Sequence, residues 1–133
     1  MTTIAERIAA FLCDTREIPQ AARASAARCV LDLVSAAIAG YDTANATSVR
    51  RVAGAVWGSG PAAIWFTDQR STAAGAAFAN AAAACALDLD DGHRAAAGHP
   101  GAAVIPAVFA ALDIDDAGAE RALTAIALGY EVG

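Results

Sequence analysis

The chain has 133 residues, of which 57% are hydrophobic, and its 9 basic and 14 acidic side chains give a net charge of −5. Every basic residue is an arginine, so this chain can supply neither a Schiff-base lysine nor a lysine general base. Without a basic stripe to neutralise phosphates, nucleic acid is not an expected partner, and the length suits one domain with its own core.

The first half of the chain reads as three helices. Alanine, the strongest helix former, is the commonest residue, and larger apolar residues recur at helical spacing. Residues 3–13 predict a short amphipathic helix. Pro19 suits the first turn of a second helix, which we expect Gly40 to terminate. Threonines at 43 and 47 are candidate N-caps of a third helix, which should end at Gly58.

Residues 62–66 are the one convincing extended segment in the chain. A single strand cannot form a sheet, so we expect either a connector or an edge strand that pairs with sequence outside this chain. Ser71 is the predicted N-cap of a helix that runs to about Leu87. Asn80 lies in the middle of that helix, and we expect it to be a buried amide with its hydrogen bonds satisfied.

Two more helices are predicted, over residues 102–112 and 120–132. Pro106 should be tolerated only in a first turn or at a kink. The break between these helices contains several turn-forming residues: Asp113, Asp115, Asp116 and Gly118. The fold class is therefore all-α: a single bundle-like domain over residues 1–133 with one short extended segment.

The cysteines and the uncharged segments indicate in which cellular compartment the protein is expected. Three cysteines (Cys13, Cys29 and Cys85) are an odd number without CxxC spacing, which predicts reduced, buried thiols in a cytoplasmic protein. The N-terminus does not read as a signal peptide. The longest uncharged run, residues 71–87, is too short and too weakly apolar to predict a membrane span.

Residues 85–102 concentrate the titratable side chains between two uncharged, alanine-rich segments. Both histidines lie there, together with three aspartates and an arginine: Asp88, Asp90, Asp91, His93, Arg94 and His99. Such a group between apolar helices indicates a site rather than a solvated turn.

Several interpretations of this stretch are open from spacing alone. The Asp-Leu-Asp-Asp run matches the D-x-D-D pattern of class II terpene cyclases, which are several-fold longer chains. Histidines six residues apart do not suit a helical metal pair, so no metal is expected. A carboxylate and an imidazole could instead transfer protons beside a substrate carboxylate, or the aspartates could cap the following helix.

The pattern resembles the signature of the MmgE/PrpD family, which includes 2-methylcitrate dehydratase and cis-aconitate decarboxylase. The resemblance is carried by residues 80–91, by Gly-His-Pro-Gly at 98–101 and by Val-Ile-Pro at 104–106. It extends over most of the chain, since further segments fit in the same order: 18–19, 31–32, 39–40, 64–65 and 129–132.

The resemblance implies a helical domain, a homodimer in most relatives and cofactor-free, metal-independent proton transfer beside a carboxylate of a small polycarboxylate. It matches Asp88 to an active-site carboxylate and His99 to an active-site histidine. His93 is a further candidate for proton transfer, and Arg94, Gly92 and Asp91 are candidates for substrate binding.

The sequence also departs from the family pattern. Gly92 stands where relatives such as cis-aconitate decarboxylase have an active-site threonine, and Cys85 stands where relatives commonly have histidine. Family members are several hundred residues long and carry an α/β lid domain with basic residues. We therefore expect a partner chain to complete a dehydratase-, decarboxylase- or epimerase-like enzyme. The alternatives are a non-catalytic helical subunit and a scaffold redirected to a biosynthetic intermediate.

Overall fold

The computed structural model of the protein describes residues 2–95, 97–115 and 117–133. Six α-helices form within these residues, with one two-stranded hairpin and one 3-10 turn, so the all-α prediction is confirmed. In chain order the elements are α1 (Ile4–Asp14), α2 (Gln20–Gly40), α3 (Ala44–Trp57), β1 (Ala62–Ala63), β2 (Arg70–Ser71), α4 (Ala73–Ala84), η1 (Cys85–Leu87), α5 (Pro100–Asp115) and α6 (Ala119–Val132).

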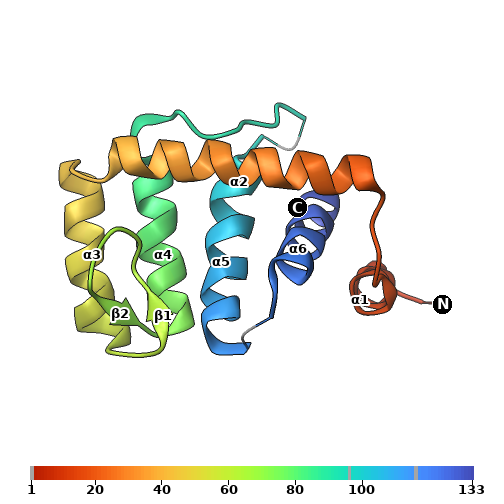
Figure 1. The fold of residues 1–133 in the computed structure, drawn as a ribbon, viewed down its shortest axis with the longest axis horizontal. Coiled ribbons are helices and arrows are strands. Elements are labelled where there is room, and N and C mark those ends of the chain that lie inside the picture. The colour runs from red at the N-terminus through yellow and green to blue at the C-terminus, as the bar shows by residue number, and fades with distance from the viewer. Residues whose placement is uncertain (1, 96, 116) are drawn as a thin grey trace.

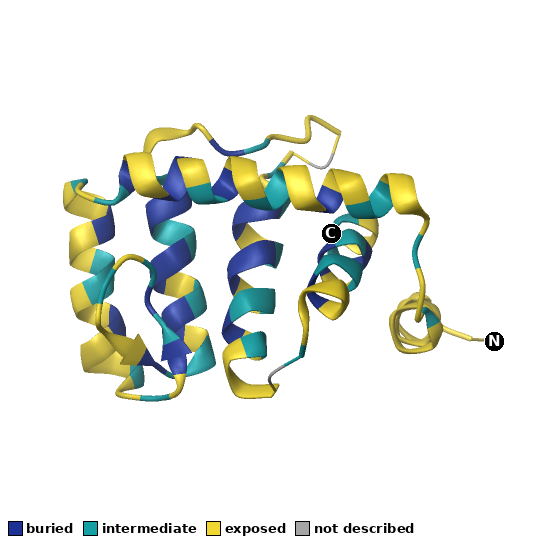
Figure 2. Ribbon diagram, viewed as in Figure 1, coloured by how far each residue is buried: buried dark blue, intermediate teal, exposed yellow. Residues whose placement is uncertain are grey.

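Helix α2 organises the arrangement because it lies across one end of the row formed by α3, α4, α5 and α6 (Figure 1). It packs against α4, α5 and α6, while α3 packs on α4, α4 on α5 and α5 on α6. The buried residues follow these contacts: they line the inner side of α2 and the facing sides of α4 and α5 (Figure 2).

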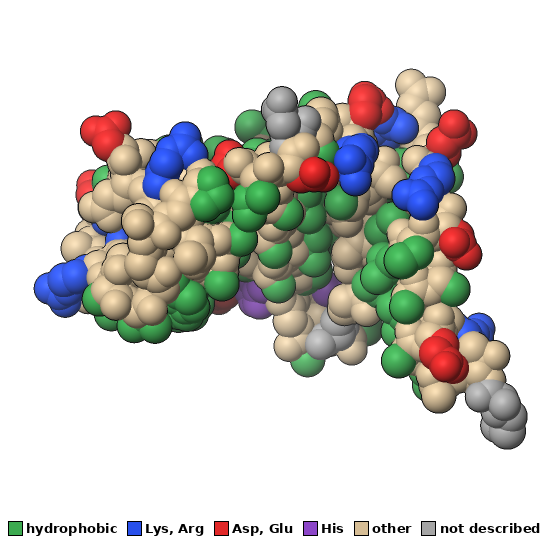
Figure 3. All heavy atoms as spheres, turned by 90° about the horizontal axis from the view of Figure 1, so that it is seen from below, with side chains coloured by type: hydrophobic (Ala, Val, Ile, Leu, Met, Phe, Trp, Pro, Cys, Tyr) green, Lys and Arg blue, Asp and Glu red, His purple; other side chains and the backbone are tan. Residues whose placement is uncertain are grey.

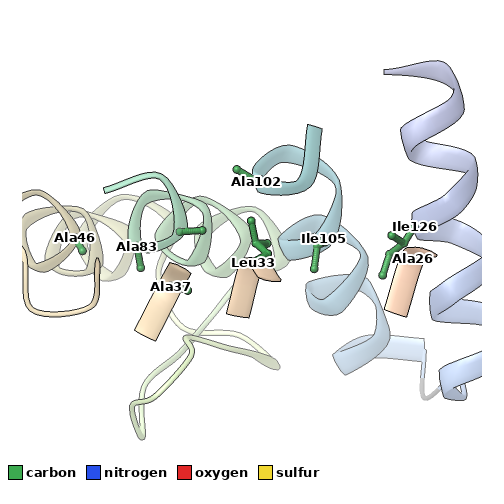
Figure 4. Packing of buried hydrophobic residues seen from close by; sticks show 9 residues of the cluster. Ala26, Leu33, Ala37, Ala46, Ala83, Ala102, Ile105 and Ile126 are labelled. Atoms are coloured by element: carbon green, nitrogen blue, oxygen red, sulfur yellow. The ribbon is translucent and has the colours of Figure 1, made fainter. Parts of the chain in front are cut away.

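The core is built from a few large side chains with alanines between them. Leu33, Ile105 and Ile126 are at most 1% exposed and lie along α2 with Ala37, Ala83 and Ala102 (Figure 4). Alanine allows the helix axes to approach closely, and its burial costs almost no side-chain entropy.

Helix α2 ends at Gly40, but Gly40 is not the residue beyond the helix end that the sequence predicted as its terminator. It is the last helical residue, and the cap is Tyr41 in a right-handed helical conformation. A Cβ atom at position 40 would lie 2.1 Å from the Ala83 carbonyl oxygen. Glycine is therefore needed here for the contact between α2 and α4, not for a left-handed turn.

The extended segment pairs within the chain, which corrects both predicted alternatives. Ala62 pairs with Ser71 and Ala63 with Arg70 in an antiparallel hairpin. Two-residue strands are too short to leave a periodic signal in the sequence. Asn80 is buried and holds the hairpin against α4, as expected for a satisfied amide: its Oδ1 accepts from the Trp65 N–H (2.9 Å) and its Nδ2 donates to the Ala63 carbonyl (3.1 Å).

Three predicted boundaries are wrong. Thr72, not Ser71, caps α4, because the Thr72 hydroxyl accepts from the Gly75 N–H, whereas the Ser71 hydroxyl donates to the Gly58 carbonyl. Helix α5 begins at Pro100, so Pro106 lies beyond its first turn. The helix also continues to Asp115, which shortens the predicted break. Asp116 lies outside the described residues.

Helix α1 is set apart from the other helices. Thr3 and Glu6 form a reciprocal capping box at its start, and these hydrogen bonds lower the pKa of Glu6. None of its residues is buried. Figure 3 shows wide groups of apolar side chains between scattered charges on the face seen from below.

The three cysteines are free, but the expectation that they are buried is wrong. Cys13 and Cys85 are exposed and Cys29 is partly buried. Cys13 belongs to α1, which buries none of its residues, and Cys85 begins the exposed turn after α4. Among the described residues, no single helix is long and apolar enough to cross a membrane, although the bent pair α2 and α3 passes that test by length and composition.

Candidate functional site

The site begins where α4 ends. The last turn tightens into η1, and Asp88 then adopts a left-handed backbone conformation with φ of 56°. Aspartate is one of the few residues with a side chain that tolerates this region. Its N–H donates to the Cys85 carbonyl at 3.2 Å, which closes the turn. Asp88 is thus fixed directly at the end of a buried helix.

The other side of the site is the start of α5. Residues 93 and 98 form an isolated antiparallel bridge, in which the His93 N–H donates to the Gly98 carbonyl at 2.9 Å. The bridge brings the chain back to Pro100, the first residue of α5, where the fixed φ of proline favours helix initiation. His99 lies between the bridge and the helix, so both of its backbone neighbours are held.

His99 lies between two carboxylates. Its Nδ1 is 3.2 Å from Oδ2 of Asp90, and its Nε2 is 3.6 Å from Oδ1 of Asp88. The two carboxylates differ in environment: the Asp90 side chain is 1% exposed, that of Asp88 is 87% exposed, and the imidazole itself is 41% exposed. One nitrogen of the ring therefore faces the protein interior and the other faces a solvated carboxylate.

Cys85 completes the group, because its thiol donates to the same Asp90 oxygen across 3.7 Å. Partial burial raises the pKa of Cys85 to about 11, and the charge and hydrogen bond of Asp90 and the charge of Asp88 act in the same direction. The thiol is consequently protonated at neutral pH. It donates to Asp90 and is a poor nucleophile.

These side chains share one surface pocket of about 400 Å³. Its walls come from α4, η1 and α5, and its lining combines the titratable group with alanines: Ala81, Cys85, Asp88, Asp90, His99, Ala102 and Ala103. A small ligand in this pocket would meet a carboxylate, an imidazole and apolar methyl groups.

Asp91 points away from this pocket and holds the start of α5. Its Oδ1 accepts from the Gly101 N–H at 3.1 Å, where the positive end of the helix dipole favours a carboxylate. Tyr130 of α6 lies beside it. Burial is the main cause that raises the pKa of Tyr130, and the nearby Asp91 and Cys29 raise it further. The Tyr130 hydroxyl makes no hydrogen bond of ordinary geometry within the described residues. A Cβ on Gly101 would lie within 2.5 Å of both Asp91 and Tyr130.

The remaining predicted residues lie around the pocket but do not line it. His93 is one of the two bridge residues and Arg94 follows it in the chain, and both are exposed. Gly92 is closer, since a Cβ built there would lie 3.9 Å from Cε1 of His99, an ordinary contact. A side chain at position 92 would therefore face the imidazole.

The same group could hold a cation by composition. Asp88, Asp90 and His99 each offer one ligand atom, and these atoms lie within 4.8 Å of one another. A metal would use one imidazole nitrogen, with ligands at about 2.0 to 2.2 Å for zinc. Here each nitrogen faces a different carboxylate, at 3.2 and 3.6 Å, and attraction between these groups accounts for the arrangement without an ion.

The sequence interpretation did not include Asp90 and Cys85 in the site, although both contact its central residues. Residue spacing gives no signal for Asp90, because Asp88 has a left-handed backbone and Asp90 lies at a bend, so the alternation of an extended strand does not apply. In the structure the three aspartates separate into a pocket pair and a helix cap.

The comparisons with known proteins give one match. The chain matches the family model described as MmgE/PrpD N-terminal domain over residues 4–133, which is nearly its whole length. No curated protein and no solved structure gives a significant match.

Proposed function

This chain belongs to the MmgE/PrpD family through its N-terminal domain, and from that membership we propose that it carries half of the active site of a lyase or isomerase. The reaction would move a proton on the carbon next to a carboxylate of a small polycarboxylate or related substrate. The enzyme class would be hydro-lyase, decarboxylase or epimerase, and no metal or other cofactor takes part.

The pairing of Asp88 with His99 at one pocket is the observation that carries this proposal. Their closest atoms are 3.6 Å apart and both side chains reach solvent. An imidazole can accept or donate a proton near neutral pH. His99 would transfer the proton, and Asp88 would orient the ring and the substrate. Asp88 would itself be a poor partner for a substrate carboxylate, so that contact must come from elsewhere.

Arginine and backbone groups near the pocket offer part of that contact. Arg94 is exposed on the neighbouring loop, and Gly92 leaves its peptide uncovered beside His99. In this proposal Arg94, Gly92 and Asp91 line the substrate side of a closed site, and His93 is a second proton-transfer candidate. In the described chain none of these four residues lines the pocket, so a closed site would require the loop or another chain to move toward it.

A partner chain would provide the rest of the site. Proton abstraction next to a carboxylate creates negative charge, which basic residues stabilise, and this chain has no lysine. Asp88 is 87% exposed, and Leu87 and Leu89 on either side of it are exposed apolar residues. We propose that a chain with the lid domain and the remaining helices covers this surface, alone or with a second copy of this chain.

Substitution of the pair tests the enzymatic role. In the active complex, Asp88→Asn and His99→Ala should each lower turnover by about a hundredfold or more, the scale of a lost acid–base group. Asparagine tolerates the left-handed backbone at position 88, so Asp88→Asn removes only charge. Asp68→Asn, on the exposed hairpin loop, is the matched control and should have no effect.

A second candidate function is a non-catalytic helical subunit, which Gly92 and Cys85 favour because both replace side chains that relatives use. It requires Asp88→Asn and His99→Ala to leave the activity of the complex unchanged. A third candidate keeps the pocket but turns it to a biosynthetic intermediate. Co-purification separates these from the partner hypothesis: a stable monomer without a larger partner subunit would exclude the two-chain enzyme.

A further inference from the structure

We propose that Asp90 is a positioning residue that fixes the tautomer of His99, so that neutral His99 carries its proton on Nδ1 and presents Nε2 as the basic nitrogen. This proposal rests on the proposed function, because it specifies which atom of His99 would transfer the proton. It concerns a residue that neither the family match nor the sequence motif assigned.

The contact between the two side chains determines which of them can donate a proton to the other. Oδ2 of Asp90 is 3.2 Å from Nδ1 of His99. An ionised carboxylate only accepts hydrogen bonds, so the ring nitrogen facing it must donate. The tautomer of a neutral histidine follows from the hydrogen bond that one of its nitrogens makes. Nδ1 then holds the proton, and the lone pair is on Nε2.

Burial makes Asp90 the dominant partner of the two carboxylates. Its side chain is 1% exposed, whereas the Asp88 side chain is 87% exposed and its oxygen lies farther from the ring, at 3.6 Å. Charge interactions are stronger in the protein interior than at the surface, where water screens them. The interior carboxylate should therefore determine the form of the ring, and the solvated one should not compete.

The remaining atoms of Asp90 support a role other than stability. Oδ1 is buried and has no hydrogen-bond partner among the described residues, and the Cys85 thiol donates to the same oxygen that faces His99. A buried carboxylate oxygen without a donor is destabilising. Thr or Ser at position 90 would bury no unpaired carboxylate oxygen. Neither residue, however, could offer the His99 Nδ1–H a fully charged acceptor.

Nitrogen NMR of the full 133-residue chain tests the proposal without any substrate. Long-range proton–nitrogen spectra of chain labelled with ¹⁵N-histidine distinguish Nδ1–H from Nε2–H, and a His93→Gln variant assigns the two histidines. At a pH where His99 is neutral, Nδ1–H should be the major form. In Asp90→Asn the side-chain amide can donate, so the major form should change to Nε2–H. Asp91→Asn is the matched control, because Asp91 accepts from the Gly101 N–H at the start of α5 and does not line the pocket that contains His99. This variant should keep Nδ1–H.

Each outcome decides the proposal. An Nε2–H form in the unsubstituted chain would overturn it directly, even if Asp90→Asn fails to fold. An unchanged tautomer in folded Asp90→Asn would overturn it as well. In the active complex, an amide at position 90 should reduce turnover by up to about 10⁴-fold, as when a histidine is held in the wrong tautomer. If the tautomer follows Asp90 but His99→Ala retains activity, the proposed function fails and the positioning role stands.

Discussion

Asp88 and Asp90 are two residues apart and face the same imidazole, but only Asp88 is open to water. Their different exposure follows from local backbone geometry. The left-handed Asp88 ends the turn after α4 at the surface, and the chain then carries Asp90 under His99 and Cys85. Two identical side chains thus have different environments through position alone, one open to solvent and one buried beside the ring.

The Cys85 thiol reports on this buried charge. Its pKa of about 11, against an ordinary 9.0, leaves about a hundredfold less thiolate at pH 8. Alkylation of the full chain with iodoacetamide, followed by peptide mapping, should label Cys85 far more slowly than the exposed Cys13. The Cys85 rate should rise as the pH approaches 11.

The variant Asp90→Asn removes the nearest charge and should increase labelling of Cys85 at pH 8. Equal rates for Cys13 and Cys85 in the unsubstituted chain would contradict the raised pKa. The same shift bears on stability. The unfolded chain loses this proton first as the pH rises above 9, so the contribution of Cys85 to folding stability declines between about pH 9 and 11.

At the scale of helices, close approach between α2 and α4 supports the site, because η1 follows directly from α4. Gly40→Ala should destabilise the fold by about 1 to 3 kcal/mol, since the new methyl group would lie 2.1 Å from a backbone oxygen that cannot rotate away. Chemical denaturation monitored by circular dichroism measures the free energy of unfolding.

Gly54→Ala is the matched control for this substitution. Gly54 lies within α3, and a Cβ there would have no neighbour within 4 Å. Alanine should therefore stabilise the helix by about 0.5 to 1 kcal/mol through its higher helix propensity. If the two variants changed stability alike, the close contact of α2 with α4 would be wrong.

Helices could be predicted from the sequence because each is long enough to show its periodicity. The hairpin partner could not, since Arg70 and Ser71 form a strand of only two residues. The role of Gly40 could not be predicted either, because it depends on a helix distant in the sequence. A terminal glycine suggests a left-handed cap, and only the neighbouring α4 reveals that Gly40 is needed for packing.

The candidate site also has features that the sequence predicts and features that it does not. Its location could be predicted because titratable residues cluster between alanine-rich helices, and Asp88 and His99 do meet at one pocket. The depth of Asp90 depends on how the loop returns over α4 and α5, which residue spacing does not specify. Exposure of the cysteines likewise depends on which helix faces remain uncovered.

At the scale of the whole molecule, α1 contributes little to the packed body. It buries none of its residues, and its apolar side chains Ile4, Ile8 and Phe11 line a groove against the end of α6. Deletion of residues 1–15 should therefore lower stability by less than about 1 kcal/mol, which for a chain of this size is about 4 °C at most in Tm. Thermal unfolding monitored by circular dichroism measures the change.

The reference for this deletion is Ile105→Ala, which empties a fully buried position in the core. That single substitution should cost about 2 to 5 kcal/mol. A deletion as damaging as Ile105→Ala would show that α1 packs on the body and helps to form its core.

The course of α2 has a consequence for biosynthesis. Ala26 near its start packs in the same cluster as Ile126 of α6, about a hundred residues later in the chain. At a synthesis rate of about 5 to 20 residues per second, Ile126 is synthesised roughly 5 to 20 seconds after Ala26. The face of α2 around Ala26 therefore lacks its contact with α6 during this time. During this interval α3 and α4 can already assemble, but the part of α2 around Ala26 stays available to chaperones until α6 leaves the ribosome.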